Sequence, residues 1–142
     1  MSATQTLGWR EWVSLPDLGI DRIKAKVDTG ARTSALHAFD VRLEDGEDQP
    51  MVRFSVHPKQ RNNDEVIQCL APLLDERAVR DSGGHSEDRY VIETQIQIGP
   101  LIHTVEMTLT NRDNMGFRML LGRTAMAGNY QVDPGRSYLM GK

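Results

Sequence analysis

The 142-residue sequence predicts an all-β fold, a closed barrel with one short helix. Short segments in which apolar and polar residues alternate recur along the chain, and this is the pattern of half-buried strands. Clusters of Gly, Pro, Asn and Asp separate these segments and are typical of turns. Helical character is confined to a short stretch at 124–127. Short strands at regular spacing with little helix indicate a closed barrel.

Length and composition are those of one ordinary globular domain spanning residues 1–142, with its core at about 7–140. Hydrophobic residues make up 39% and charged residues 26% of the chain. No apolar run is long enough to span a membrane, and the first six residues do not resemble a signal peptide, so we expect a cytoplasmic protein. The net charge of -3 argues against nucleic acid as a partner.

In the N-terminal half, alternation predicts strands that are separated by turns. The turn 16–19 contains Pro and Gly, the acidic segment 44–48 is expected to form a solvated hairpin tip, and 58–65 is expected to be a loop. The expected strands cover residues 7–15, 23–27, 33–43 and 51–57.

In the C-terminal half, Pro72 interrupts the apolar segment 66–74, which is therefore either an edge strand or a strand with a bend. A glycine-containing turn at 81–86 precedes the next strand at 90–92. We expect a hairpin about Gly99 and Pro100. The remaining expected elements are a turn at 111–114, the short helix at 124–127 and a terminal strand at 138–140.

The stretch Ala25–Ala31 organises the proposed function. Ile23, Ala25 and Val27 alternate with lysines, so the strand is expected to deliver Asp28 to the floor of a cleft. The Thr29 hydroxyl is suited to bonding the backbone and holding the loop rigid, and Gly30 is expected to turn the backbone at positive φ. Taken alone, Asp-Thr-Gly also fits a turn that merely satisfies local amides.

A second motif, Met119–Arg123, is an apolar run that ends in Gly-Arg. In this order, Asp-Thr-Gly-Ala and Leu-Leu-Gly-Arg resemble the two halves of the retropepsin-like aspartic protease signature. The chain resembles most closely a bacterial family that is labelled ATP-dependent zinc proteases and is now regarded as retropepsin-like. The blocks that carry this resemblance are 8–13, 25–38, 119–124 and 132–134, within a likeness that runs from about 7 to 140.

The resemblance implies a role for each residue of these motifs. Asp28, Thr29 and Gly30 would form the catalytic loop, in which Thr29 braces the loop across a dimer and Gly30 leaves room for substrate. A flap is expected to cover the cleft, with the hairpin 82–85 favoured and the tip at 45–46 as the alternative. The remaining candidates are Ala31, Arg32, Arg123, Gly83 and Gly84 for substrate binding, and Leu120, Leu121 and Gly122 for support of the loop.

Aspartic protease chemistry predicts a homodimer. Two carboxylates about 3 Å apart share one proton, so that one acts as a base on water while the other polarises the scissile carbonyl. This chain supplies a single Asp-Thr-Gly. The second carboxylate must come from another copy, which predicts a C2 dimer with Asp28 and its symmetry mate on the axis.

Arg32 departs from the retropepsin pattern, which usually has an acid at this place that pairs with the arginine of the second motif. Arg32 and Arg123 would then lie near the cleft without a carboxylate between them, which favours an acidic, Glu-rich peptide or protein substrate. The resemblance also implies work near an ATP-grasp ligase that adds glutamates to a ribosomal protein. Alternatively, Arg32 pairs with Glu11, with Asp133 or with an acid of the partner chain.

The residues do not support the zinc and ATP labels, so we expect no metal and no cofactor. There is no His-Glu-x-x-His motif and no phosphate-binding Gly-rich loop, and the histidines lack metal-ligand spacing. Cys69 is expected to be a small buried apolar residue and not a nucleophile. The four histidines are His37, His57, His85 and His103.

Three functions stay open at this point. The first is an aspartic-type peptidase that acts as a homodimer. The second is a non-catalytic dimeric module on the same fold, which binds an acidic peptide or a glutamate ligase. The third is a structural or assembly barrel in which Asp-Thr-Gly is only a turn.

Overall fold

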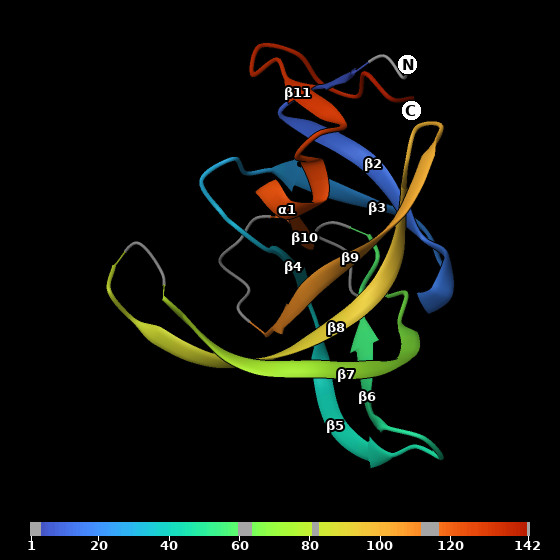
Figure 1. Cartoon of the computed structure of the whole chain (residues 1–142). Coiled ribbons are helices and arrows are strands. Elements are labelled where there is room, and N and C mark those ends of the chain that lie inside the picture. Colours follow the sequence, from blue (N-terminus) through green and yellow to red (C-terminus); the bar gives the residue numbers. More distant parts are fainter. Residues whose placement is uncertain (1–3, 60–63, 81–82, 112–116, 142) are drawn as a thin grey trace.

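The computed structural model describes residues 4–59, 64–80, 83–111 and 117–141, and its arrangement is drawn in Figure 1. A single turn of 3-10 helix at Pro16–Leu18 and the short helix α1 (Arg123–Met126) interrupt a fold made of strands. The strands are β1 (Gln5–Leu7), β2 (Arg10–Leu15), β3 (Ile20–Val27), β4 (Ser34–His37), β5 (Phe39–Asp45), β6 (Pro50–Val56), β7 (Ile67–Arg80), β8 (Ser86–Ile98), β9 (Leu101–Thr110), β10 (Met119–Leu121) and β11 (Tyr130–Val132).

The larger sheet closes on itself, which confirms the predicted barrel. Its strand order is β2-β3-β10-β4-β9-β8-β7-β6-β5, and β2 also pairs with β8 through Ser14 and Gln97. The ring therefore consists of β2, β3, β10, β4, β9 and β8, while β7, β6 and β5 continue outward from β8. Closure removes the free edges of the strands in the ring.

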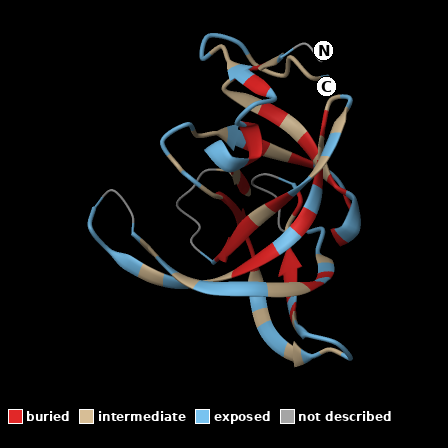
Figure 2. Ribbon diagram, in the orientation of Figure 1, coloured by how far each residue is buried: buried red, intermediate tan, exposed pale blue. Residues whose placement is uncertain are grey.

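The core fills the inside of this barrel, continues into β6 and β7, and has the alternation expected from the sequence. On β8, Thr94, Ile96 and Ile98 are buried, whereas Glu93 and Gln95 are exposed. Figure 2 shows the buried residues gathered on the barrel strands, and the outer parts of β5, β7 and β8 mostly exposed. Each fully buried Leu or Ile contributes about 1.5–3 kcal/mol, so the ring is the stable part of the molecule that positions the loops.

Several predicted elements are confirmed. The hairpin about Gly99 and Pro100 joins β8 to β9, and the acidic tip joins β5 to β6. Pro72 lies inside β7, and the pairing with β8 shifts register between Leu73 and Asp75, so the strand with a bend is the correct alternative. Of the predicted turns, residues 112–114 and 81–82 lie outside the described residues.

The predicted terminal strand at 138–140 is wrong. Tyr138 has a positive φ of 56°, and the backbone N–H groups of Leu139 and Met140 donate to Glu11 (2.8 and 3.0 Å). The carboxylate also accepts the Gly8 N–H at 2.6 Å and is fully buried. We call this arrangement the Glu11 clasp, because a side chain of β2 satisfies amides that strand pairing would otherwise satisfy.

Candidate active site

The two sequence motifs meet because β10 inserts between β3 and β4. β10 runs parallel to β3, with Leu121 opposite Val27, and antiparallel to β4, with Met119 opposite Leu36. The chain therefore leaves β3, forms residues 28–33, which we call the Asp28 loop, and returns as β4 on the other side of β10. This topology places the second motif directly against the loop.

Hydrogen bonds fix the backbone of the Asp28 loop. The Asp28 N–H donates to the Leu121 carbonyl at 2.9 Å, and the Ala31 N–H donates to the Asp28 carbonyl at 3.2 Å. The Gly30 N–H donates to Oδ1 of Asp28 at 3.0 Å. No described residue donates to the second carboxylate oxygen, and the side chain is half-buried. Asp28 is thus held in place, and one of its oxygens has no donor among the described residues.

The reason for glycine at position 30 differs from the one that the sequence predicted. Gly30 is absent from the described residues with positive φ, so the prediction of a left-handed turn at this position is wrong. A Cβ at Gly30 would lie 3.3 Å from Asp28 Oδ1, which is tighter than an ordinary contact. Glycine therefore keeps space beside the carboxylate. The Thr29 side chain is exposed, and in this chain Thr29 contributes its carbonyl.

The second motif braces the loop along its length. The N–H of Arg123 donates to the Ala31 carbonyl at 2.8 Å, and the N–H of Thr124 donates to the Arg32 carbonyl at 2.9 Å. The Arg123 guanidinium donates through Nη1 to the carbonyls of Thr29 (3.2 Å) and Gly30 (3.5 Å). Arg123 therefore contacts the loop backbone from an exposed position.

Leu120, Leu121 and Gly122 lie beneath the loop. Leu121 is fully buried, and Leu120 is half-buried. The Gly122 N–H donates to Oγ of Ser34 at 3.0 Å. A Cβ at Gly122 would meet the Thr33 carbonyl carbon at 2.5 Å and the Ser34 nitrogen at 2.8 Å, so a side chain there would push β10 from the start of β4.

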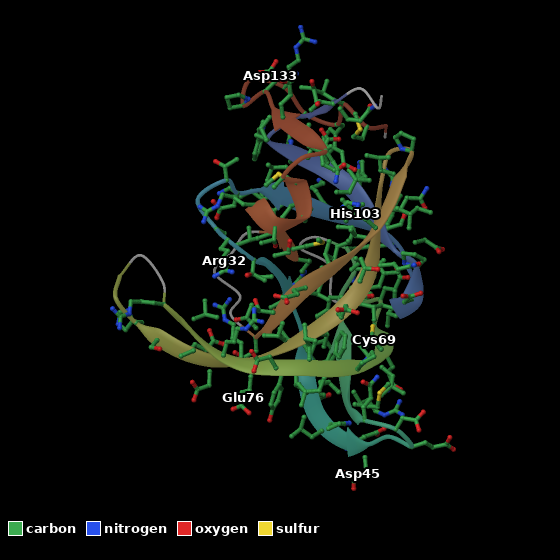
Figure 3. The ribbon with its side chains drawn as sticks, in the orientation of Figure 1. Arg32, Asp45, Cys69, Glu76, His103 and Asp133 are labelled. Carbon is green, nitrogen blue, oxygen red and sulfur yellow. The ribbon has the colours of Figure 1, made fainter. Side chains whose placement is uncertain are left out.

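Arg32 has no acidic partner among the described residues. Its side chain is exposed, and Figure 3 shows it projecting beside the barrel. The Glu11 carboxylate accepts the backbone N–H groups of the clasp. Asp133 contacts Arg136 at 3.5 Å and accepts the Gly135 N–H. The two intrachain pairings that the sequence left open for Arg32 are therefore absent, and an acid of a partner chain stays an open alternative.

The favoured flap is the end of the β7–β8 hairpin. The two strands remain paired up to Arg80 and Ser86, and Gly83 and Gly84 are exposed, with Gly84 at a φ of 83°. Figure 1 shows this hairpin extending beyond the barrel on the same side of the view as the loop after β3. Asp45, at the alternative tip, lies at the lower end of the view, away from Arg32 (Figure 3).

Comparison with known proteins agrees with this geometry. Residues 6–142 match the family described as "Retropepsin-like aspartic endopeptidase RimB". The chain belongs to the RimB-like family. The structure also resembles a crystal structure of a Legionella pneumophila protein of unknown function, with a TM-score of 0.82, 25% identity, and coverage of 97% of this chain and 99% of that one. The retropepsin-like barrel predicted from the sequence is thereby confirmed.

The RimB-like chain also matches part of longer proteins. It is 46% identical over 136 residues to a "Probable alpha-L-glutamate ligase" of Shewanella pealeana and 41% identical over 140 residues to a protein of the same name from Desulfotalea psychrophila. These matches cover 96% and 99% of this chain. The chain spans only 30% of the length of each of these curated relatives.

The structure also shows the surroundings of Cys69 and of the residue types that could bind a metal. Burial raises the pKa of the Cys69 thiol to about 11, so this side chain is protonated at neutral pH and is not an activated nucleophile. No three His, Cys, Asp or Glu side chains within the described residues are grouped as metal ligands. Among the same residues, no helix has the length and apolar character needed to cross a membrane.

Sequence reasoning missed one residue of the site, Ser34, and the structural role of Glu11. Ser34 receives the Gly122 N–H on its hydroxyl, and nothing in the local sequence signals that contact. Glu11 was weighed only as a partner for Arg32. The sequence does indicate that Glu11 is buried, because Glu11, Val13 and Leu15 alternate along β2 and lie on its buried face.

Proposed function

We propose that this RimB-like chain is an aspartic-type peptidase that acts as a C2 homodimer, with Asp28 of each protomer forming the catalytic pair. One observation carries the proposal. Asp28 sits in a loop whose backbone is bonded to the second motif, while only one of its carboxylate oxygens is engaged within the described chain. A carboxylate that is rigidly placed yet accessible suits acid–base chemistry.

In the proposed dimer, the two Asp28 carboxylates would lie about 3 Å apart and share one proton. The ionised carboxylate takes a proton from water, whose oxygen attacks the scissile carbonyl carbon. The protonated carboxyl donates a hydrogen bond to the carbonyl oxygen as charge develops there. Collapse of the tetrahedral intermediate breaks the C–N bond, and a proton passes to the leaving amine.

The proposed substrate is an acidic peptide or protein, such as a Glu-rich segment. The support comes from Arg32, which is an exposed residue of the Asp28 loop and has no carboxylate partner among the described residues. A guanidinium group binds carboxylates through two parallel hydrogen bonds. Gly83 and Gly84 at the end of the β7–β8 hairpin would close over the bound peptide and exclude water.

Peptide turnover tests this proposal. Wild-type protein and Asp28→Asn are incubated with acidic, neutral and basic peptides of equal length, and products are identified by mass spectrometry. We expect cleavage of the acidic peptide by wild type only. Equal or faster cleavage of the basic peptide would remove the acidic specificity, and turnover by Asp28→Asn would remove the mechanism.

A second candidate is a non-catalytic dimeric module that binds an acidic peptide or a glutamate ligase. The observation that favours it is the name of the longer relatives, "Probable alpha-L-glutamate ligase", of which this chain matches 30%. In this case Asp28→Asn would retain or even tighten peptide binding, and wild type would release no product. The same incubations therefore distinguish the two candidates.

A further inference from the structure

A stack of aromatic rings and cations covers the outer face of β2 and β3. Arg10 lies 4.5 Å from the Trp9 ring centroid and 5.0 Å from that of Tyr138. Lys24 lies 5.8 Å from the Tyr138 centroid and 5.1 Å from that of Trp12, and the Tyr138 and Trp12 rings stack. Arg22 ends the series, 4.0 Å from the Trp12 centroid. The ring–cation ladder therefore consists of Trp9, Arg10, Tyr138, Lys24, Trp12 and Arg22.

The ladder follows from strand alternation and from the Glu11 clasp. Residues of β2 and β3 that alternate with the buried ones point outward, and Trp12 faces Lys24 across the pair. Lys26 extends the row, opposite Arg10. Tyr138 joins the ladder because its N–H donates to the Arg10 carbonyl at 3.0 Å, next to the segment that the clasp holds.

The cations of the ladder have no acidic partners within the described part of the chain. Arg10 donates through Nε to the Ser137 hydroxyl at 3.3 Å, and that is a neutral acceptor. Several other described guanidinium groups, though not that of Arg32, are paired with carboxylates: Arg53 with Glu44, Arg77 with Asp75 and Glu106, Arg89 with Glu87, and Arg136 with Asp133. A local excess of positive charge thus lies on a protein with a net charge of -3.

Two pockets adjoin the ladder at Trp12 and Arg22. Trp12 and Arg22 line a pocket of about 420 Å³, together with Lys24 and Ile67, and also a second pocket of about 230 Å³. The larger pocket contains two carboxylates, Asp21 and Glu65, of which Glu65 contacts Lys59 at 3.6 Å. Among the described residues, no acidic side chain lines the smaller pocket, which Arg22 also borders.

We propose that the ring–cation ladder is a docking surface for an extended acidic segment of a partner polypeptide. A cation stacked on a ring keeps its N–H groups free to donate to carboxylates, while the rings contact the methylene groups of Glu side chains. Arg22, Lys24 and Lys26 occupy alternate positions of one strand, about 6.6 Å apart, and alternate side chains of an extended peptide have the same spacing. The rings and cations of the ladder come from residues outside the Asp28 loop, and the proposal does not depend on peptidase activity.

Charge complementarity favours an acidic polypeptide over a nucleic acid. The basic residues of the ladder occupy two adjacent strands, and the rest of the protein is more acidic than the net charge of -3 indicates. A nucleic acid carries one charge about every 1.7 Å of duplex and needs a broad basic footprint. A short acidic segment needs only the length of β3.

Tryptophan fluorescence tests the proposal directly, because Trp9 and Trp12 are the only tryptophans of the chain and both belong to the ladder. The full-length protein is titrated with N-acetylated hexaglutamate at about 0.05 M and about 0.3 M salt. We expect a saturable change in fluorescence that weakens at the higher salt. Arg22→Gln is expected to raise the dissociation constant about tenfold, and Arg22→Lys by less, because lysine keeps the charge but not the planar fork.

Arg42→Gln is the matched control, since it removes one exposed arginine from β5, a strand outside the barrel ring. Its dissociation constant should equal that of wild type, and far-UV circular dichroism and thermal unfolding establish that each variant is folded. Arg22→Gln should weaken binding to the same extent in an Asp28→Asn background, in which the probe is not cleaved, whether or not the protein proves to be a peptidase. An absence of peptidase activity and an absence of binding at the ladder are therefore distinguishable.

Three outcomes would overturn the proposal. The first is the absence of a fluorescence change with hexaglutamate. The second is an equal weakening by Arg22→Gln and Arg42→Gln, which would indicate attraction by total charge alone. The third is tighter binding of a single-stranded oligonucleotide of the same charge than of hexaglutamate, which would assign the surface to nucleic acid.

Discussion

The Glu11 clasp and the Asp28 loop place two carboxylates in opposite situations. Glu11 is fully buried and accepts three backbone N–H groups, from Gly8, Leu139 and Met140. Asp28 is half-buried and accepts one N–H, from Gly30. Both oxygens of the first carboxylate accept backbone N–H groups, whereas one oxygen of the second has no donor among the described residues.

This difference indicates which acid is structural and which is available for chemistry. A buried carboxylate is tolerated only when hydrogen bonds replace its hydration, and the clasp uses those bonds to tie the C-terminal segment to β2. Around Asp28, backbone groups and Arg123 make the bonds that hold the loop. The carboxylate is therefore positioned while most of its hydrogen-bonding capacity stays available. The predictions below separate the two roles.

Asp28→Asn is expected to have the largest effect, on activity alone. The amide cannot accept a proton from water, so turnover of an acidic peptide should fall by at least about 10³-fold. The unfolding temperature should stay within a few degrees of wild type, because the Asn Oδ1 can still accept the Gly30 N–H. Peptide turnover and thermal unfolding are measured on the same samples, and a large loss of stability would contradict the division of roles.

Glu11→Gln is expected to have the largest effect on stability. Loss of the charge-assisted bonds, and an NH₂ group directed at backbone donors, should cost about 3 kcal/mol in the free energy of unfolding. For a domain of this size that lowers the unfolding temperature by about 10 °C. Glu76→Gln, on the exposed face of β7, is the control and should behave as wild type. Equal stability of the two variants would refute the clasp.

Gly122→Ala tests whether the Asp28 loop depends on the close approach of β10. The added Cβ would meet backbone atoms of Thr33 and Ser34 at 2.5–2.8 Å, which cannot move cheaply. We expect a loss of about 2 kcal/mol in stability and a drop in turnover of about 10²-fold through misplacement of the loop. Gly135→Ala is the matched control, since a Cβ added at Gly135 would lie 3.4 Å from its nearest contact, the Asp133 side chain. Unchanged turnover in Gly122→Ala would mean that the loop does not need this brace.

Arg123→Gln should give the smallest effect. It removes the hydrogen bonds to the Thr29 and Gly30 carbonyls, which are exposed, so stability should fall by about 1 kcal/mol or less. Turnover should fall by about tenfold, and Arg123→Lys should recover part of it by restoring one donor. A change in substrate charge preference, measured with acidic and basic peptides, would instead assign Arg123 to substrate binding.

Local patterns in the sequence predicted much of the fold. Alternation in β3, β6 and β8 identified the strands and their buried faces, and Gly99 with Pro100 marked the hairpin turn. The prediction of a strand at 138–140 was wrong because apolar character alone does not reveal a side chain elsewhere that captures the amides. Gly30 was identified correctly as a residue of the loop, but for a backbone reason that the structure does not support.

By itself, the sequence determined which segments are strands, which of their faces are buried, and that two motifs of one family are present in the expected order. The first two are properties of residues two or a few positions apart, and the third is the order of two short motifs along the chain. Only the tertiary structure decided that β10 lies between β3 and β4, that Glu11 holds the C-terminal segment, and that Arg10, Lys24 and Arg22 stack with three rings. Strand pairing and the clasp bring these distant residues together, and apolar–polar alternation does not indicate which strand pairs with which.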